Sequence, residues 1–194
     1  MEQFYSLQGE GYNVGKPAYF IRIGGCDVGC KWCDVKEAWS PLLHPLTQTN
    51  DIIKSIIEHD NIDNVVVTGG EPLKYNMDYL CNELHALKIK TFLETSGTQK
   101  FSGQWDWICL SPKMRVHPLK TFYELANELK VIIQDENDFQ WAEINAEKVN
   151  KNAYLYLQPE WSSYNKIINP IIEYIKANPK WILSLQIHKF LKIP

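Results

Sequence analysis

Apolar residues follow two alternating patterns along the chain. Short continuous apolar runs predict strands at residues 17–23, 64–68, 90–94, 106–110, 128–133, 153–157 and 181–187. Helical spacing of apolar residues predicts helices at 52–57, with Thr49 as N-cap, and at 78–87, 138–149 and 164–177. Continuous apolar strands that alternate with helices are typical of a parallel sheet with covered faces.

The number of strand–helix units predicts an incomplete barrel. A closed eightfold α/β barrel typically needs about 250 residues, whereas this chain has 194. We therefore expect an α/β fold, a partial TIM-like barrel of six or seven mostly parallel strands with outer helices, as one domain over residues 1–194. In such sheets the chemistry gathers at the carboxyl ends of the strands.

Composition and charge narrow the classes of function. The net charge is −3, and the 20 Lys and Arg residues are dispersed, which argues against a nucleic-acid partner. Apolar runs long enough to cross a bilayer and a secretory leader pattern are both missing from the sequence. An odd count of five cysteines argues against a disulfide framework. We expect a reducing, cytoplasmic setting without a membrane partner.

Three cysteines follow the first predicted strand with the spacing C-x3-C-x2-C, namely Cys26, Cys30 and Cys33. Three thiolates suit a 4Fe–4S cluster in which one iron stays open for another ligand. A structural zinc site usually takes four ligands in two pairs, and Cys81 and Cys109 are isolated. The spacing therefore favours a cluster over zinc, but it names no reaction.

A second motif, Gly69-Gly70-Glu71-Pro72, closes the predicted strand at 64–68. Alone it predicts only a tight turn, but together with the cysteine motif it resembles the radical S-adenosylmethionine (SAM) superfamily. The resemblance implies that SAM completes the open iron and that Gly69, Gly70 and Glu71 bind its amino group. Further SAM contacts are implied at Gly97, Ser111, Pro112, Lys113 and Gln158.

The two chain ends narrow the resemblance. The opening Ser6-Leu7-Gln8-Gly9-Glu10-Gly11 and the ending Gln186-Ile187-His188-Lys189, with Ile193-Pro194, resemble the 7-carboxy-7-deazaguanine synthase family over residues 3–194. This implies a lyase of queuosine and 7-deazapurine biosynthesis, which supplies a tRNA modification. Its substrate, 6-carboxy-5,6,7,8-tetrahydropterin, would lose ammonia in a ring contraction begun by a 5′-deoxyadenosyl radical at C6.

The same resemblance implies a pterin site and two partners. A forked guanidinium at Arg22 suits the substrate carboxylate, and Glu10 suits its guanidine-like N–H groups. A flavodoxin-like electron donor and a homodimer are also implied. The expected substrate contacts are Leu7, Gln8, Gly9, Glu10, Arg22, Thr95, His188 and the terminal carboxylate of Pro194.

One position departs from the family pattern. Asp-Thr usually follows the last cysteine, and the threonine hydroxyl helps to hold Mg²⁺, but this chain has Asp34-Val35. Valine offers no oxygen to a hard cation. Three outcomes are open: no magnesium, magnesium held by Asp34 and water, or a different ion.

Two rival functions are consistent with parts of the sequence. Glycyl-radical activating enzymes are small radical SAM proteins with the same cysteine spacing, but they act on a large protein substrate. A zinc-stabilised binding module would explain the cysteines without any reaction. Both rivals leave the two chain-end motifs unexplained.

Overall fold

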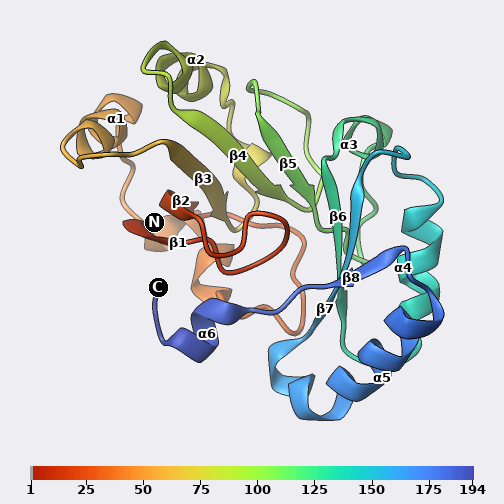
Figure 1. Ribbon diagram of the computed structural model, residues 1–194. Helices are drawn as coiled ribbons and strands as arrows, with labels where there is room; N and C mark the ends of the chain where they lie inside the picture. Colours follow the sequence, from red (N-terminus) through yellow and green to blue (C-terminus); the bar gives the residue numbers. More distant parts are fainter. Residues whose placement is uncertain (1) are drawn as a thin grey trace.

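The computed structural model of the chain describes residues 2–194 and shows one open, strongly curved sheet (Figure 1). Its eight strands lie side by side in chain order; β1 runs antiparallel to β2, and all later neighbours are parallel. The strands are β1 (Glu2–Leu7), β2 (Pro17–Ile23), β3 (Asn64–Gly69), β4 (Lys90–Thr95), β5 (Trp107–Leu110), β6 (Glu128–Ile133), β7 (Tyr154–Pro159) and β8 (Trp181–Leu183). The expected partial barrel is therefore confirmed.

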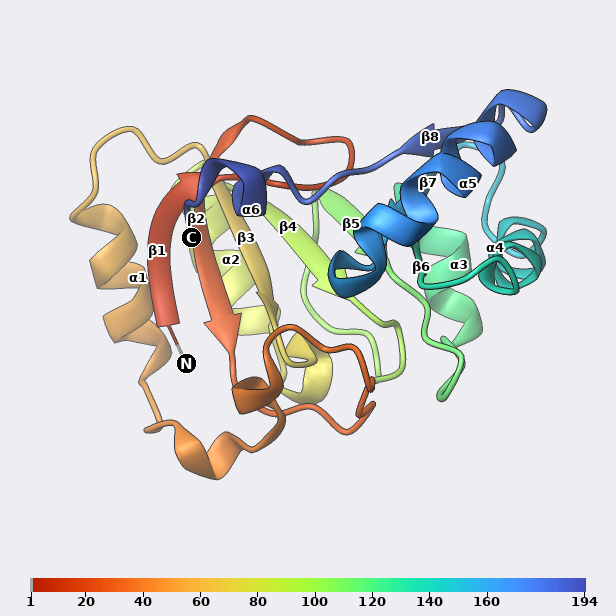
Figure 2. The same ribbon diagram turned by 90° about the horizontal axis from the view of Figure 1, so that it is seen from below.

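Five helices cover the outer face of the sheet, and a sixth lies across its open side (Figures 1 and 2). The outer helices are α1 (Thr49–Ile57), α2 (Asp78–Ala86), α3 (Lys120–Leu125), α4 (Asp138–Ala146) and α5 (Tyr164–Ala177). After β8 the chain returns to β1 through α6 (Ile187–Leu191). In this part of the chain, residues 2–194, no helix is both long and apolar enough to span a bilayer.

Strand alternation divides the core into an outer and an inner part. Leu129, Val131 and Ile133 of β6 are fully buried in the outer core, against the helices. A separate inner cluster contains Ala18, Phe20 and Val66, with Phe4 and Phe92 packed against it. Because side chains alternate along a strand, the intervening residues of β6 face the interior of the barrel. Those residues include Glu128 and Lys130.

Several element boundaries differ from the prediction. The sheet has eight strands rather than six or seven, because β1 was not expected: Glu2, Gln3 and Ser6 interrupt its apolar residues, and none of its residues is fully buried. The helix α1 begins at Thr49, and Gln48, not Thr49, is its N-cap residue. The predicted strand at 181–187 ends at Leu183, and the predicted helix at 138–149 ends at Ala146. The short helices α3 and α6 were not foreseen, because five or six residues carry little periodicity.

Candidate active site

A cavity of about 280 Å³ lies at the carboxyl ends of the parallel strands. It brings together all but three of the residues that the sequence nominated; the exceptions are Glu71, Gly97 and Pro112. The nominated residues that line it are Leu7, Gln8, Gly9, Glu10, Arg22, Cys26, Cys30, Cys33, Asp34, Gly69, Gly70, Thr95, Ser111, Lys113, Gln158, His188 and Pro194. Motifs from both chain ends and from five strands therefore meet in one space.

Cys26, Cys30 and Cys33 are free, half-buried thiols on the loop after β2, and all three line the cavity. Burial raises the pKa of Cys26 and of Cys30, and the neighbouring Lys113 ammonium pulls the pKa of Cys30 back down. The loop is tied down where it starts, because the Cys26 N–H donates to the Trp39 carbonyl over 3.1 Å. Three thiols that converge on one cavity beside a cation fit a cluster with three protein ligands.

Gly69 and Gly70 allow β3 to end against the cysteine loop. A Cβ atom on Gly69 would lie 2.2 Å from the Ile23 carbonyl oxygen, and one on Gly70 would lie 2.4 Å from the Gly25 carbonyl oxygen. Gly69 also has φ +140°, a conformation that favours glycine. This contact positions the Gly-Gly segment directly beside the start of the cysteine loop, and both glycines line the cavity.

Glu71 is buried, with 1% of its surface exposed, and lies behind the cavity wall. Its carboxylate accepts from the Thr95 hydroxyl over 2.6 Å and from the Ser96 N–H over 2.8 Å. The expected contact between Glu71 and the SAM amino group stays a prediction. The bonds in the structure give Glu71 a positioning role, because Thr95 and Ser96 both line the cavity.

Gly97 and Pro112 also lie outside the cavity lining. Gly97 has φ +72°, and a Cβ atom there would lie 2.7 Å from Leu110 Cδ1, so glycine is required for close packing. Pro112 separates two residues that do line the cavity, Ser111 and Lys113, whose side chains are joined by a hydrogen bond from Lys113 Nζ. The predicted SAM contacts of Gly97 and Pro112 remain untested.

The two chain ends meet over the open side of the barrel. The Ile187 N–H donates to the Gly9 carbonyl over 3.0 Å, and the Ser6 hydroxyl donates to the Pro194 carbonyl over 3.2 Å. A Cβ atom on Gly9 would lie 2.2 Å from His188 Nδ1, so His188 packs directly on this glycine. Burial lowers the pKa of His188, which favours a neutral imidazole facing the cavity.

A chain of charged and amide side chains crosses the barrel interior. Lys130 Nζ donates to Glu10 Oε2 over 2.6 Å and to Glu94 Oε2 over 2.9 Å. Gln8 Nε2 donates to the other oxygen of Glu94 over 3.0 Å, and Gln186 Nε2 donates to the other oxygen of Glu10 over 2.8 Å. We call Glu10, Lys130 and Glu94 the interior array.

Charge pairing controls ionisation in the interior array. Burial opposes the charge of Glu10, but the Lys130 ammonium and its hydrogen bond lower the Glu10 pKa to about 2. Burial opposes the charge of Lys130 as well, yet the surrounding acidic groups raise its pKa well above the usual range. Glu10 and Lys130 are therefore both ionised near neutral pH.

Sequence reasoning did not nominate Lys130 or Glu94 for the site. Lys130 lies within the apolar run of β6. A charged residue among apolar neighbours of a strand was the signal that could have indicated a role in the site. Glu94 was noticed only as part of a polar segment at the end of its strand. Both line the cavity, and the side chain of Lys130 is only 5% exposed.

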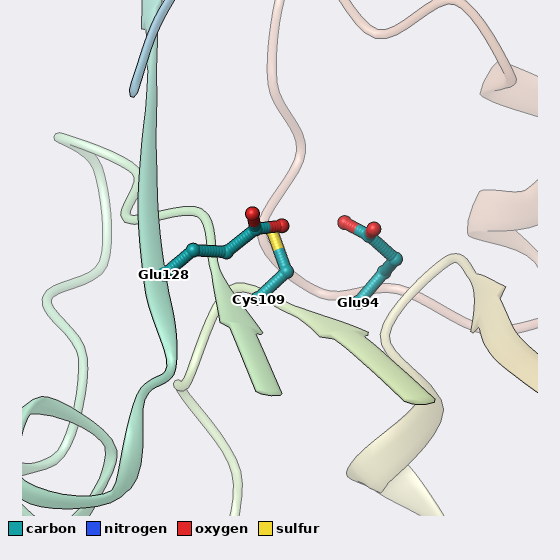
Figure 3. Close-up of side chains that lie close together, drawn as sticks. All are labelled: Glu94, Cys109 and Glu128. Carbon is teal, nitrogen blue, oxygen red and sulfur yellow. The ribbon is translucent and has the colours of Figure 1, made fainter. Parts of the chain in front are cut away.

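Glu94, Cys109 and Glu128 form a second cluster, from β4, β5 and β6 (Figure 3). Their ligand atoms lie within 4.8 Å of one another. However, Glu94 already accepts a hydrogen bond from the Lys130 ammonium, and Glu128 accepts one from the Tyr12 N–H over 2.8 Å. Burial raises the pKa of Cys109 and of Glu128, which favours their protonated forms. These contacts argue against a cation here, and we assign no metal to the cluster.

The Asp34 carboxylate, which a magnesium ion would need as a ligand, is already hydrogen-bonded to other side chains. Its Oδ2 accepts from Lys189 Nζ over 2.6 Å and from Gln186 Nε2 over 3.3 Å. Lys189 outweighs the effect of burial and lowers the Asp34 pKa. Because Val35 supplies no oxygen and an ammonium already neutralises Asp34, these residues do not fit a magnesium ion.

Comparison with known proteins agrees with this geometry. The profile of the radical SAM superfamily matches residues 20–137. A 7-carboxy-7-deazaguanine synthase of Flavobacterium psychrophilum is 53% identical over 194 residues, covering 100% of this chain and 91% of that protein. One from Synechocystis sp. is 45% identical, covering 99% and 91%. The crystal structure of QueE from Escherichia coli superposes with a TM-score of 0.82 at 30% identity, covering 95% of this chain and 91% of that one.

An open parallel barrel with three thiols at the end of its second strand defines the class of protein. The chain belongs to the radical SAM superfamily. Within that superfamily it belongs to the 7-carboxy-7-deazaguanine synthase family, because the similarity extends over its whole length, including both chain ends that meet at the cavity.

Proposed function

We propose that this protein is a radical SAM lyase that converts 6-carboxy-5,6,7,8-tetrahydropterin to 7-carboxy-7-deazaguanine with loss of ammonia. One observation carries the proposal: a single cavity joins a three-thiol loop to an interior array of hydrogen-bonding charges. The first feature suits radical generation, and the second suits a small polar heterocycle. A glycyl-radical activating enzyme or a zinc-stabilised module has no use for this pairing.

Cys26, Cys30 and Cys33 are the proposed ligands of the 4Fe–4S cluster. When bound, the cluster and SAM supply the 5′-deoxyadenosyl radical that takes a hydrogen atom from C6 of the pterin. The chain itself positions the reactants and excludes water. Trp32 and Trp39 line the cavity beside the cysteines and give that end an apolar wall.

SAM is proposed to lie between the Gly-Gly segment and the wall formed by β5 and β7. Gly69 and Gly70 line the cavity next to the cysteine loop, and Ser111, Lys113 and Gln158 line the same cavity. The Lys113 ammonium supplies the positive charge that a carboxylate would meet there. Gly97 and Pro112 would contact SAM through their backbone atoms. Glu71 would position SAM indirectly, through its hydrogen bonds to Thr95 and Ser96.

The pterin is proposed to lie between the barrel interior and the two chain ends. Arg22 would hold the substrate carboxylate; its guanidinium now donates to Glu2 over 2.6 Å, an exposed pair that a ligand can replace. Thr95 and His188 would contact the ring from opposite sides. Leu7, Gln8, Gly9 and Pro194 complete the wall.

Five further parts of the proposal concern partners, setting, magnesium and the fate of the product. A flavodoxin-like donor would reduce the cluster, the chain would act as a homodimer, and the oxygen-sensitive cluster would require a reducing, cytoplasmic setting. Magnesium would be dispensable, because Lys189 supplies a cation beside Asp34. The product would enter queuosine or another deazapurine.

An anaerobic product assay tests the proposal. The reconstituted protein is mixed with SAM, a reductant and 6-carboxytetrahydropterin, and the product is followed by absorbance and mass. We expect 7-carboxy-7-deazaguanine and ammonia in equal amounts, from a brown protein with roughly four irons per chain. Absence of product from a protein with a full cluster would refute the reaction. Tightly held zinc without iron would refute the whole class.

A further inference from the structure

The interior array is costly to bury and is joined to the cavity. Its two carboxylates and one ammonium sum to one negative charge, and the side chains of Glu10 and Glu94 are only 17% and 18% exposed. A buried ion triad contributes little net stability compared with apolar residues of similar volume. All three members line the cavity. A ligand with an excess of hydrogen-bond donors would use this arrangement.

The order of charges in the array is acceptor, donor, acceptor. Lys130 stands between the two carboxylates, which accept two of its three N–H groups among the described residues. The Gln8 and Gln186 side chains fix the outer oxygen of each carboxylate. The array is therefore held in place before any ligand binds, as specific recognition requires.

A reduced pterin offers the matching order along one edge. Its exocyclic 2-amino group donates, ring nitrogen N1 accepts, and N8–H donates. We propose that Glu94 accepts from the 2-amino group, Lys130 donates to N1, and Glu10 accepts from N8–H. This inference rests on the proposed function and deepens it, because it adds Lys130 and Glu94 as specificity-determining residues. It also assigns Glu10 to N8–H, in place of the guanidine-like N–H groups that the family resemblance implies for it.

The surroundings of the two carboxylates set the direction of the pterin. Glu10 lies on the side of His188, and its partner Gln186 also bonds Asp34 near the chain ends. Glu94 accepts from the same Lys130 ammonium as Glu10 does and lies close to Cys109 (Figure 3). Because N8 is closer to C6 than the 2-amino group is, this direction points the C6 carboxylate toward the His188 side, where Arg22, Asp34 and His188 line one hollow.

The recognised edge is also the part of the substrate that the reaction leaves intact. Replacing the purine N7 position by carbon requires that N5 of the pterin leaves as ammonia. The 2-amino group, N1 and N8 all remain in the product. An array bound to these atoms would hold the pyrimidine ring while the neighbouring ring contracts.

The test compares two ligands that differ at the positions facing Glu94 and Lys130. The second ligand is 6-carboxytetrahydrolumazine, in which a carbonyl replaces the 2-amino group and N1 carries a hydrogen. Binding of each is measured anaerobically to the protein loaded with cluster and SAM, without reductant. We expect wild type to prefer the pterin by roughly 100-fold or more, because the lumazine carbonyl would face a carboxylate.

The informative variant is Glu94→Gln, whose amide can donate to the lumazine carbonyl and still accept from Lys130. It should reduce the preference for the pterin to about tenfold or less. The matched control is Glu143→Gln, which also removes a carboxylate paired with a lysine, Lys180, but lies outside the cavity. The control should keep the wild-type preference, so a general loss of stability cannot imitate the result.

The outcomes separate this inference from the proposed function. If wild type binds and converts the pterin but does not discriminate against the lumazine, the array assignment is overturned and the reaction stands. An unchanged preference in Glu94→Gln overturns the role of Glu94 in the same way. If wild type neither binds nor converts the pterin, the proposed function and the inference both fail.

Discussion

The cysteine loop and the interior array face the same cavity but are built on opposite principles. The loop carries three free thiols, and its only regular structure before α1 is two short 3-10 helices, at Lys36–Trp39 and Pro41–Leu43. The array lies on strands and on the anchored loop at Glu10, and each carboxylate has both oxygens bonded. The first region is proposed to be completed by its ligand, whereas the second is organised without one.

This difference follows from what each region has to bind. A metal cluster forms strong bonds to thiolates and can order a flexible loop as it assembles. The pterin ring is uncharged and offers only hydrogen bonds to the interior array, and such bonds are specific only when their partners are already in position. The radical-generating end is therefore expected to depend on the cofactor for its order, and the substrate end on the fold.

The largest expected effect comes from removing one proposed cluster ligand. Cys30→Ala leaves two thiols, so the cluster should not assemble and product formation should fall to background. The interior array should be unaffected, because it shares no bond with the cysteine loop. Iron content, product yield and far-UV circular dichroism measure the three quantities.

The control for this variant is Cys81→Ala, which removes a buried cysteine on α2 that does not line the cavity. It should keep full iron content. If Cys30→Ala retained four irons and activity, or if it unfolded the barrel, the contrast between the two regions would be wrong.

The second effect tests the organisation of the interior array. Lys130→Met leaves Glu10 and Glu94 buried without their cation, which should lower the free energy of unfolding by about 3–5 kcal/mol at pH 7. The exposed pair Lys176–Glu173 supplies a matched control, since Lys176→Met should cost no more than about 0.5 kcal/mol. Urea denaturation of the cluster-free protein measures both.

The pH dependence of that loss has a defined sign. The Glu10 pKa is lowered from 4.5 to about 2 in the fold, so its ionised form contributes stability above pH 4.5, and this contribution is lost as the pH falls toward 2. Lys130→Met removes that contribution. The difference from wild type should therefore be largest at neutral pH and shrink below pH 4.5. A difference that stayed constant with pH would show that packing, not charge, explains the effect.

The sequence predicted the two regions unequally, for physical reasons. The cysteine spacing and the Gly-Gly turn are local patterns, so the thiols and β3 were correctly placed at one edge of the sheet. One of the two partners of Lys130, Glu10, lies 120 residues away in the sequence, and only the curvature of the barrel brings the two side chains together. β1 was missed because an antiparallel edge strand with mixed polar residues lacks the apolar run of its parallel neighbours. The predicted contact of Glu71 with SAM stays a prediction, and the bonds of its carboxylate to Thr95 and Ser96 could not be predicted, because they exist only in the folded chain.

The third effect concerns the outer end of the substrate site. Arg22→Lys keeps the charge but loses the forked geometry, and should weaken binding of 6-carboxytetrahydropterin about tenfold. Tetrahydropterin without the carboxylate should bind both proteins equally. Glu2→Gln is the converse variant, because it frees Arg22 from its exposed partner and should leave binding unchanged or slightly tighter. Equal losses of affinity for both ligands in Arg22→Lys would show that Arg22 does not bind the substrate carboxylate.

The smallest expected effect is the response to magnesium, which lies where the two regions meet. Asp34 follows the last cysteine, yet it is bonded to Lys189 and Gln186 of the chain-end segment and so behaves like the preorganised region. An ammonium at 2.6 Å from Asp34 Oδ2 neutralises the carboxylate that a divalent ion would otherwise use. Activity with excess Mg²⁺ and with a chelator should therefore differ by no more than about twofold.

Restoring the missing oxygen shows which residue sets this response. Val35→Thr alone should change the response to magnesium little, because the Lys189 ammonium is still paired with the Asp34 carboxylate. The double variant Val35→Thr with Lys189→Met should bind Mn²⁺ detectably by electron paramagnetic resonance and gain a magnesium response. A strong magnesium requirement in wild type would show that Asp34 resembles the three cysteines, because it too would need a bound ion to complete its site. Mn²⁺ binding by Val35→Thr alone would show that the valine, and not the lysine, keeps the ion out.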